Sequence, residues 1–138
     1  MLSVVIRNEG RFIGYCLQSI TDFVGNPEIF LVDNESTDET IRIVNRFEYH
    51  DITKLHISKD DYTPGRALNL GIKQCTEDYV MILSAHCEII KFNFDRMKSQ
   101  LDESKVGALW GKQTPIWDGK KISRRYMWSN FGDESQTN

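Results

Sequence analysis

Short apolar runs alternate with amphipathic segments along the chain. The apolar runs lie at residues 2–6, 28–32 and 79–83, and runs of this kind are typical of buried strands. Leu55 and Ile57 with their neighbours predict a further strand over 54–57. Apolar side chains at helical spacing predict helices over residues 10–22, after Ser36, from Thr63 to Gly71 and over 93–104. A last strand is predicted over 106–112, and residues 114–138 are expected to form a loop or a loosely docked tail. The alternation predicts an α/β domain with a mostly parallel sheet and helices on both faces.

Two local patterns mark where helices should begin. Ser36 followed by Glu39 fits a capping box, in which each side chain binds a backbone amide of the first turn. Thr63 followed by Pro64 fits a helix start, because proline is tolerated at the first helical position. We therefore expect one helix to follow the second strand and another to follow the third.

The composition is that of one ordinary globular domain. The chain has 138 residues, of which 40% are hydrophobic and 27% charged, with a net charge of -3, so wholesale disorder and general nucleic-acid binding are both disfavoured. No apolar stretch approaches the ~20 residues of a membrane span. Cys16, Cys75 and Cys87 are scattered, which argues against a disulfide framework and fits a reduced, cytoplasmic protein.

Polar residues follow three of the predicted strands. They are Arg7-Asn8-Glu9, Asp33-Asn34 and Ser84-Ala85-His86. Strand ends are often polar in any sheet, but ligands of open α/β sheets bind outside the carboxyl ends of the strands. Three such groups on one edge favour a binding cleft there.

Asp33 and Arg66 are the residues best suited to bind a nucleotide. A carboxylate at a strand end can accept a hydrogen bond from a base N–H or a ribose hydroxyl. Arg66 lies in a predicted first helical turn, where an arginine and the helix N-terminus could hold a diphosphate, although such an arginine is as often solvated surface. No glycine-rich dinucleotide fingerprint is present, and residues 107–112 lack the spacing of a phosphate loop.

Four segments in order resemble a family 2 glycosyltransferase of the GT-A fold. They are Val-Val-Ile-Arg-Asn-Glu at 4–9, Leu-Val-Asp-Asn-Glu-Ser-Thr-Asp-Glu-Thr at 31–40, Gly-Arg-Ala-Leu-Asn-Leu-Gly at 65–71 and Tyr-Val-Met-Ile-Leu-Ser-Ala-His-Cys at 79–87. The resemblance covers residues 3–113. Gly-Lys-Gln-Thr-Pro at 111–115 also resembles a segment of a bacterial subgroup that makes surface polysaccharides.

The resemblance implies an enzyme that transfers a sugar, with inversion, from a nucleoside diphosphate sugar to a hydroxyl of a saccharide or lipid-linked acceptor. Asn8 and Glu9 would lie beside the base, Asp33 would hydrogen-bond it and Arg66 would be the nearby cation. Arg7, Ser84 and His86 complete the donor-side residues that we expect. Asp38 is expected to cap the following helix instead of binding the donor.

The chain departs from the family pattern at residues 84–86. The usual Asp-x-Asp motif, which holds the donor ribose and a divalent metal, is replaced by Ser84-Ala85-His86, as in a subgroup with Leu-Ser-x-His. Magnesium prefers oxygen ligands, so a hydroxyl and an imidazole depart from its usual site. His86 has three open interpretations: ligand of a manganese-type ion, cation that contacts a phosphate, or structural residue.

The catalytic base of the family is usually a carboxylate downstream of residue 113. Asp118, Asp133 and Glu134 do not align with it, so we expect a domain that is incomplete at its C-terminus. One domain is expected over 1–138, with residues 1–113 as the donor-binding part. The alternative function is a non-catalytic nucleotide-sugar-binding module or a fragment without the base.

Aromatic residues gather near the end of the chain. They predict either self-association or packing back onto the domain. The group consists of Trp110, Trp117, Tyr126, Trp128 and Phe131.

Overall fold

The computed structural model describes residues 2–7, 11–47, 51–103 and 105–121. The chain divides into two compact units, residues 1–92 and residues 93–138. Each unit is described by itself.

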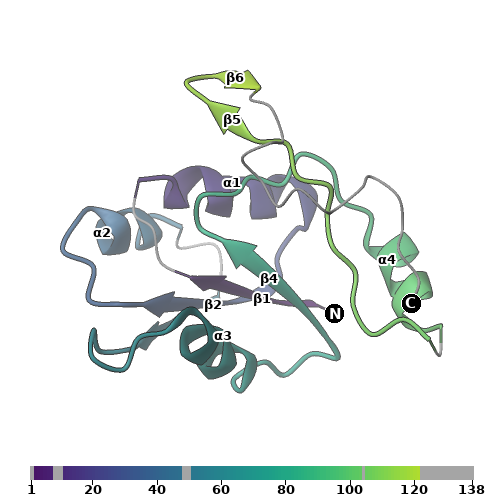
Figure 1. Cartoon of the computed structure of the whole chain (residues 1–138), viewed down its shortest axis with the longest axis horizontal. Helices are drawn as coiled ribbons and strands as arrows, with labels where there is room; N and C mark the ends of the chain where they lie inside the picture. Colours follow the sequence, from purple (N-terminus) through teal and green to yellow (C-terminus); the bar gives the residue numbers. More distant parts are fainter. Residues whose placement is uncertain (1, 8–10, 48–50, 104, 122–138) are drawn as a thin grey trace. The chain divides into compact units, whose positions relative to one another are not determined.

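The first unit is built on a parallel sheet of four strands. These are β1 (Leu2–Arg7), β2 (Glu28–Asp33), β3 (Ile52–His56) and β4 (Tyr79–Ser84). Their order in the sheet is β3-β2-β1-β4, and every neighbouring pair is parallel (Figure 1). The sequence prediction of a parallel α/β sheet with these four strands is confirmed.

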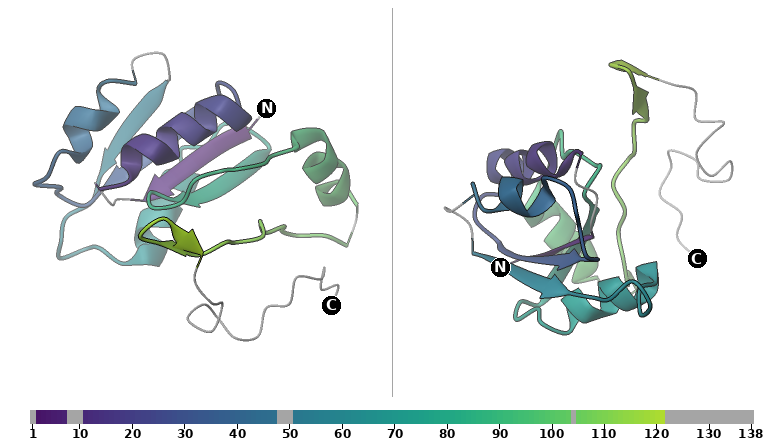
Figure 2. Two further views of the ribbon diagram at one scale, coloured as in Figure 1. Left: turned by 90° about the horizontal axis from the view of Figure 1, so that it is seen from above. Right: turned by 90° about the vertical axis from the view of Figure 1, so that its left-hand side faces the viewer.

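Helices lie on both faces of this sheet. Helices α1 (Ile13–Phe23) and α2 (Thr40–Val44) lie on one face, and α3 (Pro64–Ile72) lies on the other (Figures 1 and 2). Ile13, Cys16, Leu17 and Ile20 of α1 expose none of their surface, as the helical spacing predicts. Phe12, placed on the same face by that spacing, precedes the helix and is 40% exposed.

Helix α3 begins where the sequence predicts and packs closely on the sheet. The Thr63 hydroxyl accepts a hydrogen bond of 3.1 Å from the Arg66 amide, and Pro64 is the first helical residue. A Cβ at Gly71 would lie 2.4 Å from Val5 Cγ1. Glycine at this position therefore sets how near α3 approaches β1.

The predicted capping box at Ser36 and Glu39 is wrong. Helix α2 begins only at Thr40 and has no side-chain cap at Glu39. The Ser36 amide donates to the Asp33 carboxylate, so the residues after β2 form a turn. Asp38 lies two residues before α2 and not in its first turn as expected, but its carboxylate accepts a 3.0 Å hydrogen bond from the Thr40 amide and so satisfies one donor of the helix start. The hydroxyl of Thr40 also bonds to Asp38, and these bonds hold the pKa of the Asp38 carboxyl below its usual value.

The second unit contains one helix and one hairpin among its described residues. Helix α4 (Phe94–Leu101) lies within the predicted range and begins after Asn93, whose side chain accepts from the Arg96 amide at 2.8 Å. The strand predicted over 106–112 is wrong, because those residues have no regular structure. Its apolar side chains are interrupted by Gly107 and Gly111, which weaken a strand.

A short antiparallel hairpin instead occupies part of the predicted tail. It pairs β5 (Ile116–Trp117) with β6 (Lys120–Lys121). The intervening Asp118 and Gly119 both have positive φ, 49° and 70°, as an Asp-Gly hairpin turn requires. The prediction for 122–138, including Tyr126, Trp128 and Phe131, lies outside the described residues.

Candidate functional site

The carboxyl edge of the parallel sheet brings the predicted strand-end residues to one side. Arg7, the last residue of β1, is the register neighbour of Val32 in β2 and of Ser84 in β4. Asp33 follows Val32 and ends β2. Asp33 and Ser84 therefore end the two strands that flank β1, on the same edge, as predicted. The strand order changes direction at β1, which is where open α/β sheets form their binding crevice.

The predicted site residues differ in their exposure to solvent. Asp33 and Ser84 are half-buried, whereas Arg66 and His86 are exposed. Arg7 ends β1, but its side chain lies outside the described part of the molecule, as do Asn8 and Glu9 altogether.

Asp33 is held in a turn by its own carboxylate. Both of its carboxylate oxygens lie 3.3 Å from the Ser36 amide nitrogen, a long separation for an N–H···O bond. A carboxylate has about four acceptor positions, so this shared amide leaves it with capacity to accept from a ligand. The neighbouring Asn34 Oδ1 is buried, and no residue in the described part of the chain donates to it.

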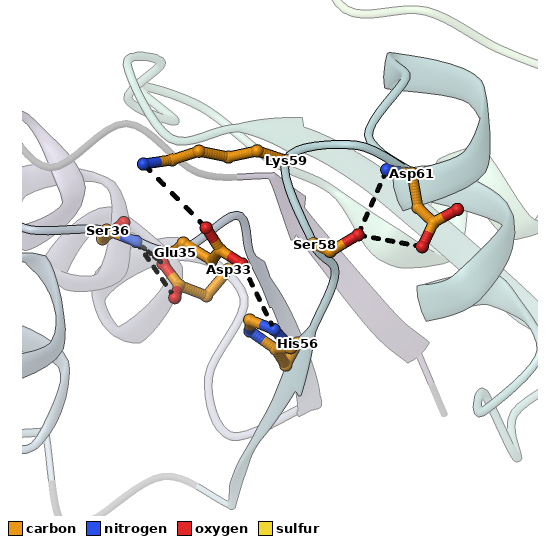
Figure 3. A network of polar contacts seen from close by, with 7 residues as sticks. All are labelled: Asp33, Glu35, Ser36, His56, Ser58, Lys59 and Asp61. Carbon is orange, nitrogen blue, oxygen red and sulfur yellow. Dashed lines mark hydrogen bonds and ion pairs between the residues drawn. The ribbon is translucent and has the colours of Figure 1, made fainter.

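A second polar group, which the sequence analysis did not identify, surrounds Glu35. Glu35 has a positive φ of 52°, and its carboxylate lies 3.9 Å from His56 Nε2 and 3.9 Å from Lys59 Nζ (Figure 3). His56 is the register neighbour of Asp33 at the end of β3. Parallel pairing of β2 with β3 thus brings the segment after β2, which carries Glu35, beside His56 and Lys59 at the end of β3. The proximity of these side chains follows from that pairing and not from their spacing in the sequence.

Arg66 lies in the first turn of α3 beside Asp61. Its Nη1 donates to the Asp61 carbonyl oxygen at 3.3 Å and lies 3.6 Å from the carboxylate oxygen Oδ1. Both side chains are largely exposed, 64% for Arg66 and 73% for Asp61, and exposed pairs of this kind contribute only ~0–1 kcal/mol. The guanidinium can therefore exchange this partner for an anion at small cost.

The segment after β4 forms a turn that carries His86. The Cys87 amide donates to the Ser84 carbonyl oxygen at 2.9 Å, which closes the turn. Ala85 exposes none of its surface, whereas His86 is exposed. Below the turn, Cys16 of α1 is buried; this burial, then the nearby Cys87 and Glu88, raise the pKa of its thiol to about 12.

The sequence matches Glycosyl transferase family 2 over residues 2–137. The chain belongs to this family.

Solved structures share the fold of this family 2 domain. S. aureus TarS superposes with a TM-score of 0.65 at 21% identity, over 83% of this chain and 23% of TarS. TarS 1-349 in complex with UDP gives a TM-score of 0.63 at 21% identity, over 83% of this chain and 38% of that chain. At this identity the likeness shows the fold alone, which is the predicted GT-A type.

One curated relative is similar in sequence as well. A TPR repeat-containing protein of Synechococcus elongatus is 30% identical over 108 residues, which are 78% of this chain and 25% of the relative. The chain thus spans about a quarter of the length of this relative and of TarS.

The described residues offer few ligands for a metal. Within residues 2–7, 11–47, 51–103 and 105–121, no three His, Cys, Asp or Glu side chains group in a way that could hold an ion. Ser84 and His86 are a hydroxyl and an imidazole, so they supply less negative charge than the two carboxylates of the usual family motif. In the same ranges no helix is long and apolar enough to cross a membrane.

Proposed function

We propose that residues 1–92 bind the nucleotide of a nucleoside diphosphate sugar at the carboxyl edge of the sheet. The observation that carries this proposal is the position of Asp33 and Ser84, which end the strands on either side of β1 in a family 2 domain. The uridine nucleotide in one TarS structure makes UDP the first probe. In this proposal Asp33 accepts a hydrogen bond from an N–H of the base.

Arg66 is the proposed partner of the diphosphate. Hydrogen bonds between an arginine and a charged phosphate contribute more than neutral ones, ~1.5–3 kcal/mol each. Displacing the exposed Asp61 costs ~1 kcal/mol or less, so the exchange favours phosphate. The helix N-terminus, where the partial positive charge of α3 lies, supports the same anion.

An Asp33→Asn substitution tests the site directly. The amide replaces one acceptor oxygen with a donor, yet its remaining oxygen can still accept from the Ser36 amide, so the turn should persist. UDP affinity measured by calorimetry should fall about five- to a hundredfold, because an unpaired base N–H costs ~1–3 kcal/mol.

Asp51→Asn is the matched control for this experiment. Asp51 is exposed and its carbonyl oxygen accepts from the Ile29 amide at the amino end of β2, on the opposite edge of the sheet. Its substitution should leave UDP affinity unchanged. Equal affinities of wild type and Asp33→Asn would remove Asp33 from the site.

The proposed reaction is transfer of the sugar with inversion, and the proposed setting is surface polysaccharide synthesis in the cytoplasm. The acceptor oxygen forms a bond to the anomeric carbon while the bond from that carbon to the diphosphate oxygen breaks. Its electron pair leaves with the nucleoside diphosphate, and the acceptor proton passes to a carboxylate base. No residue of this chain is assigned as the base, and the acceptor hydroxyl is that of a saccharide or lipid-linked saccharide.

His86 keeps its three interpretations, and one titration distinguishes them. If it ligates manganese, UDP affinity should depend on the metal and weaken on acidification, because only the neutral imidazole coordinates. If it contacts phosphate as a cation, affinity should strengthen on acidification without a metal. His86→Ala should abolish whichever dependence is present, and a flat profile in both conditions would leave His86 a structural residue.

Donor turnover distinguishes transfer from binding alone. A non-catalytic nucleotide-sugar-binding module would bind UDP and its sugars with the same residues but would release no UDP from a UDP-sugar in the presence of acceptors. The proposed enzyme should release UDP, and the Asp33→Asn variant should release it more slowly.

Self-association through the C-terminal aromatic residues is a separate prediction. It should appear in sedimentation as a mass that increases with protein concentration.

A further inference from the structure

The buried face of α1 carries a hydroxyl that reaches the segment after β4. Ser19 is only 6% exposed. Its Oγ donates to the Cys16 carbonyl oxygen within the helix at 2.7 Å and accepts a 3.0 Å hydrogen bond from the Ile89 amide. One hydroxyl therefore acts as donor and acceptor at once, which alanine cannot replace.

A second contact from the same helix reaches the other end of that segment. The Cys16 thiol lies 3.8 Å from the Ser84 carbonyl oxygen, the same oxygen that accepts the Cys87 amide and closes the turn. Cys16 and Ser19 are one helical turn apart, so they present their groups on one face. Residues 84–89 thus contact α1 at both ends, through the Ser84 carbonyl and the Ile89 amide. Buried Ala85 and exposed His86 lie between these two contacts.

We propose that Ser19 is a positioning residue for the donor site: through the Ile89 amide it fixes the turn that presents His86 at the carboxyl edge of the sheet. The inference rests on the proposed function, because it assigns that turn to nucleotide binding. Ile89 is half-buried. Without the Ser19 hydroxyl its amide loses the acceptor that it has in the structure, and the turn gains alternative conformations.

Ser19→Ala is the test variant and Ile20→Val is its matched control. Ile20 is the next residue of α1 and is fully buried, so its truncation weakens packing in the same helix without removing a hydrogen bond to the turn. By amide exchange, Ile89 should exchange about tenfold faster in Ser19→Ala once both variants are corrected for global stability. Equal exchange in the two variants would overturn the proposal.

A double-mutant cycle with His86 separates positioning from general destabilisation. Ser19→Ala should weaken UDP binding about three- to tenfold in the wild-type background and should have no further effect in His86→Ala, because the two residues act through one turn. Additive losses would overturn this inference alone. Absence of UDP binding by the wild type would contradict the proposed function and remove this role with it.

Ser19→Thr keeps the experiment decisive if Ser19→Ala fails to fold. Threonine retains the hydroxyl, so the exchange of the Ile89 amide and the UDP affinity should both stay within about twofold of wild type. A loss of UDP affinity in Ser19→Thr as large as the loss in His86→Ala would show that side-chain volume, not the hydrogen bond, holds the turn. That result would also overturn the proposal.

Discussion

The pKa of the Cys16 thiol shows how strongly burial in the core changes the proton affinity of one side chain. The thiol is fully buried in α1, and its pKa of about 12 means that the folded protein keeps it protonated at pH values where an unfolded chain, with an ordinary value of 9.0, does not. The folded state therefore binds more protons than the unfolded state above pH 9. Stability that Cys16 contributes is complete below pH 9 and is lost as pH rises from 9 towards 12.

A Cys16→Ala variant makes this loss measurable. The variant should be less stable than wild type at pH 8, because it leaves a small cavity, but the difference should shrink by about 1.4 kcal/mol at pH 10, one unit above the ordinary thiol value. Urea unfolding at the two pH values gives both differences, and other titrating groups cancel in the comparison. The same difference at pH 8 and pH 10 would contradict the prediction.

Residues of the site differ in how far the sequence could predict them. Asp33 and Ser84 could be predicted because each directly follows a clear apolar run, and parallel strands end on one edge. Glu35 with His56 and Lys59 could not, because their proximity depends on the register in which β2 pairs with β3. Ser19 lies in the middle of a predicted helix, and nothing in its local pattern indicates a partner 70 residues away.

At the scale of elements, the packing of α3 against β1 depends on the absence of a side chain at Gly71. Alanine at Gly71 would place its Cβ 2.4 Å from Val5 Cγ1, so α3 or β1 would have to move. Gly71→Ala should destabilise the protein by about 1–3 kcal/mol, as overpacked cores do. Chemical unfolding of the variant measures the loss.

Gly65 in the same helix is the control. An added Cβ there meets nothing within 4 Å, and its φ is not in the left-handed region. Gly65→Ala should be neutral or stabilising by up to about 1 kcal/mol, because alanine loses less backbone freedom than glycine. Similar losses in the two variants would show that the contact with Val5 is not the cause.

Element boundaries were predictable where a chemical signal stands beside the apolar pattern. Thr63 and Pro64 fix the start of α3, and Asn93 fixes that of α4. The predicted start of α2 is wrong because Asp33, three residues before Ser36, accepts the hydrogen bond of the Ser36 amide. The hairpin over 116–121 was missed although Asp118-Gly119 is a strong turn signal, because its two-residue strands carry too little alternation to detect.

At the scale of the whole molecule, ligand binding and stability should be coupled. A ligand that binds only the folded state stabilises it by RT ln(1 + [L]/Kd), about 2.7 kcal/mol at a hundredfold excess over Kd. UDP should therefore raise the midpoint of thermal unfolding of wild type and of Asp51→Asn, and raise it less for Asp33→Asn at the same concentration. A midpoint that UDP leaves unchanged in all three proteins would contradict the proposed nucleotide site.

The strand order also bears on the sequence of events as the protein is synthesised. β1 pairs with β2 and with β4, but the residues of β4 lie about three times as far along the chain, which adds about 1 kcal/mol to the entropic cost of closing the loop. On the ribosome β2, β3 and α3 leave the exit tunnel before β4, so one edge of β1 stays open until residue 84 has emerged. The nascent chain thus exposes a strand edge of the core until β4 has emerged, and this interval is when we expect it to need a chaperone.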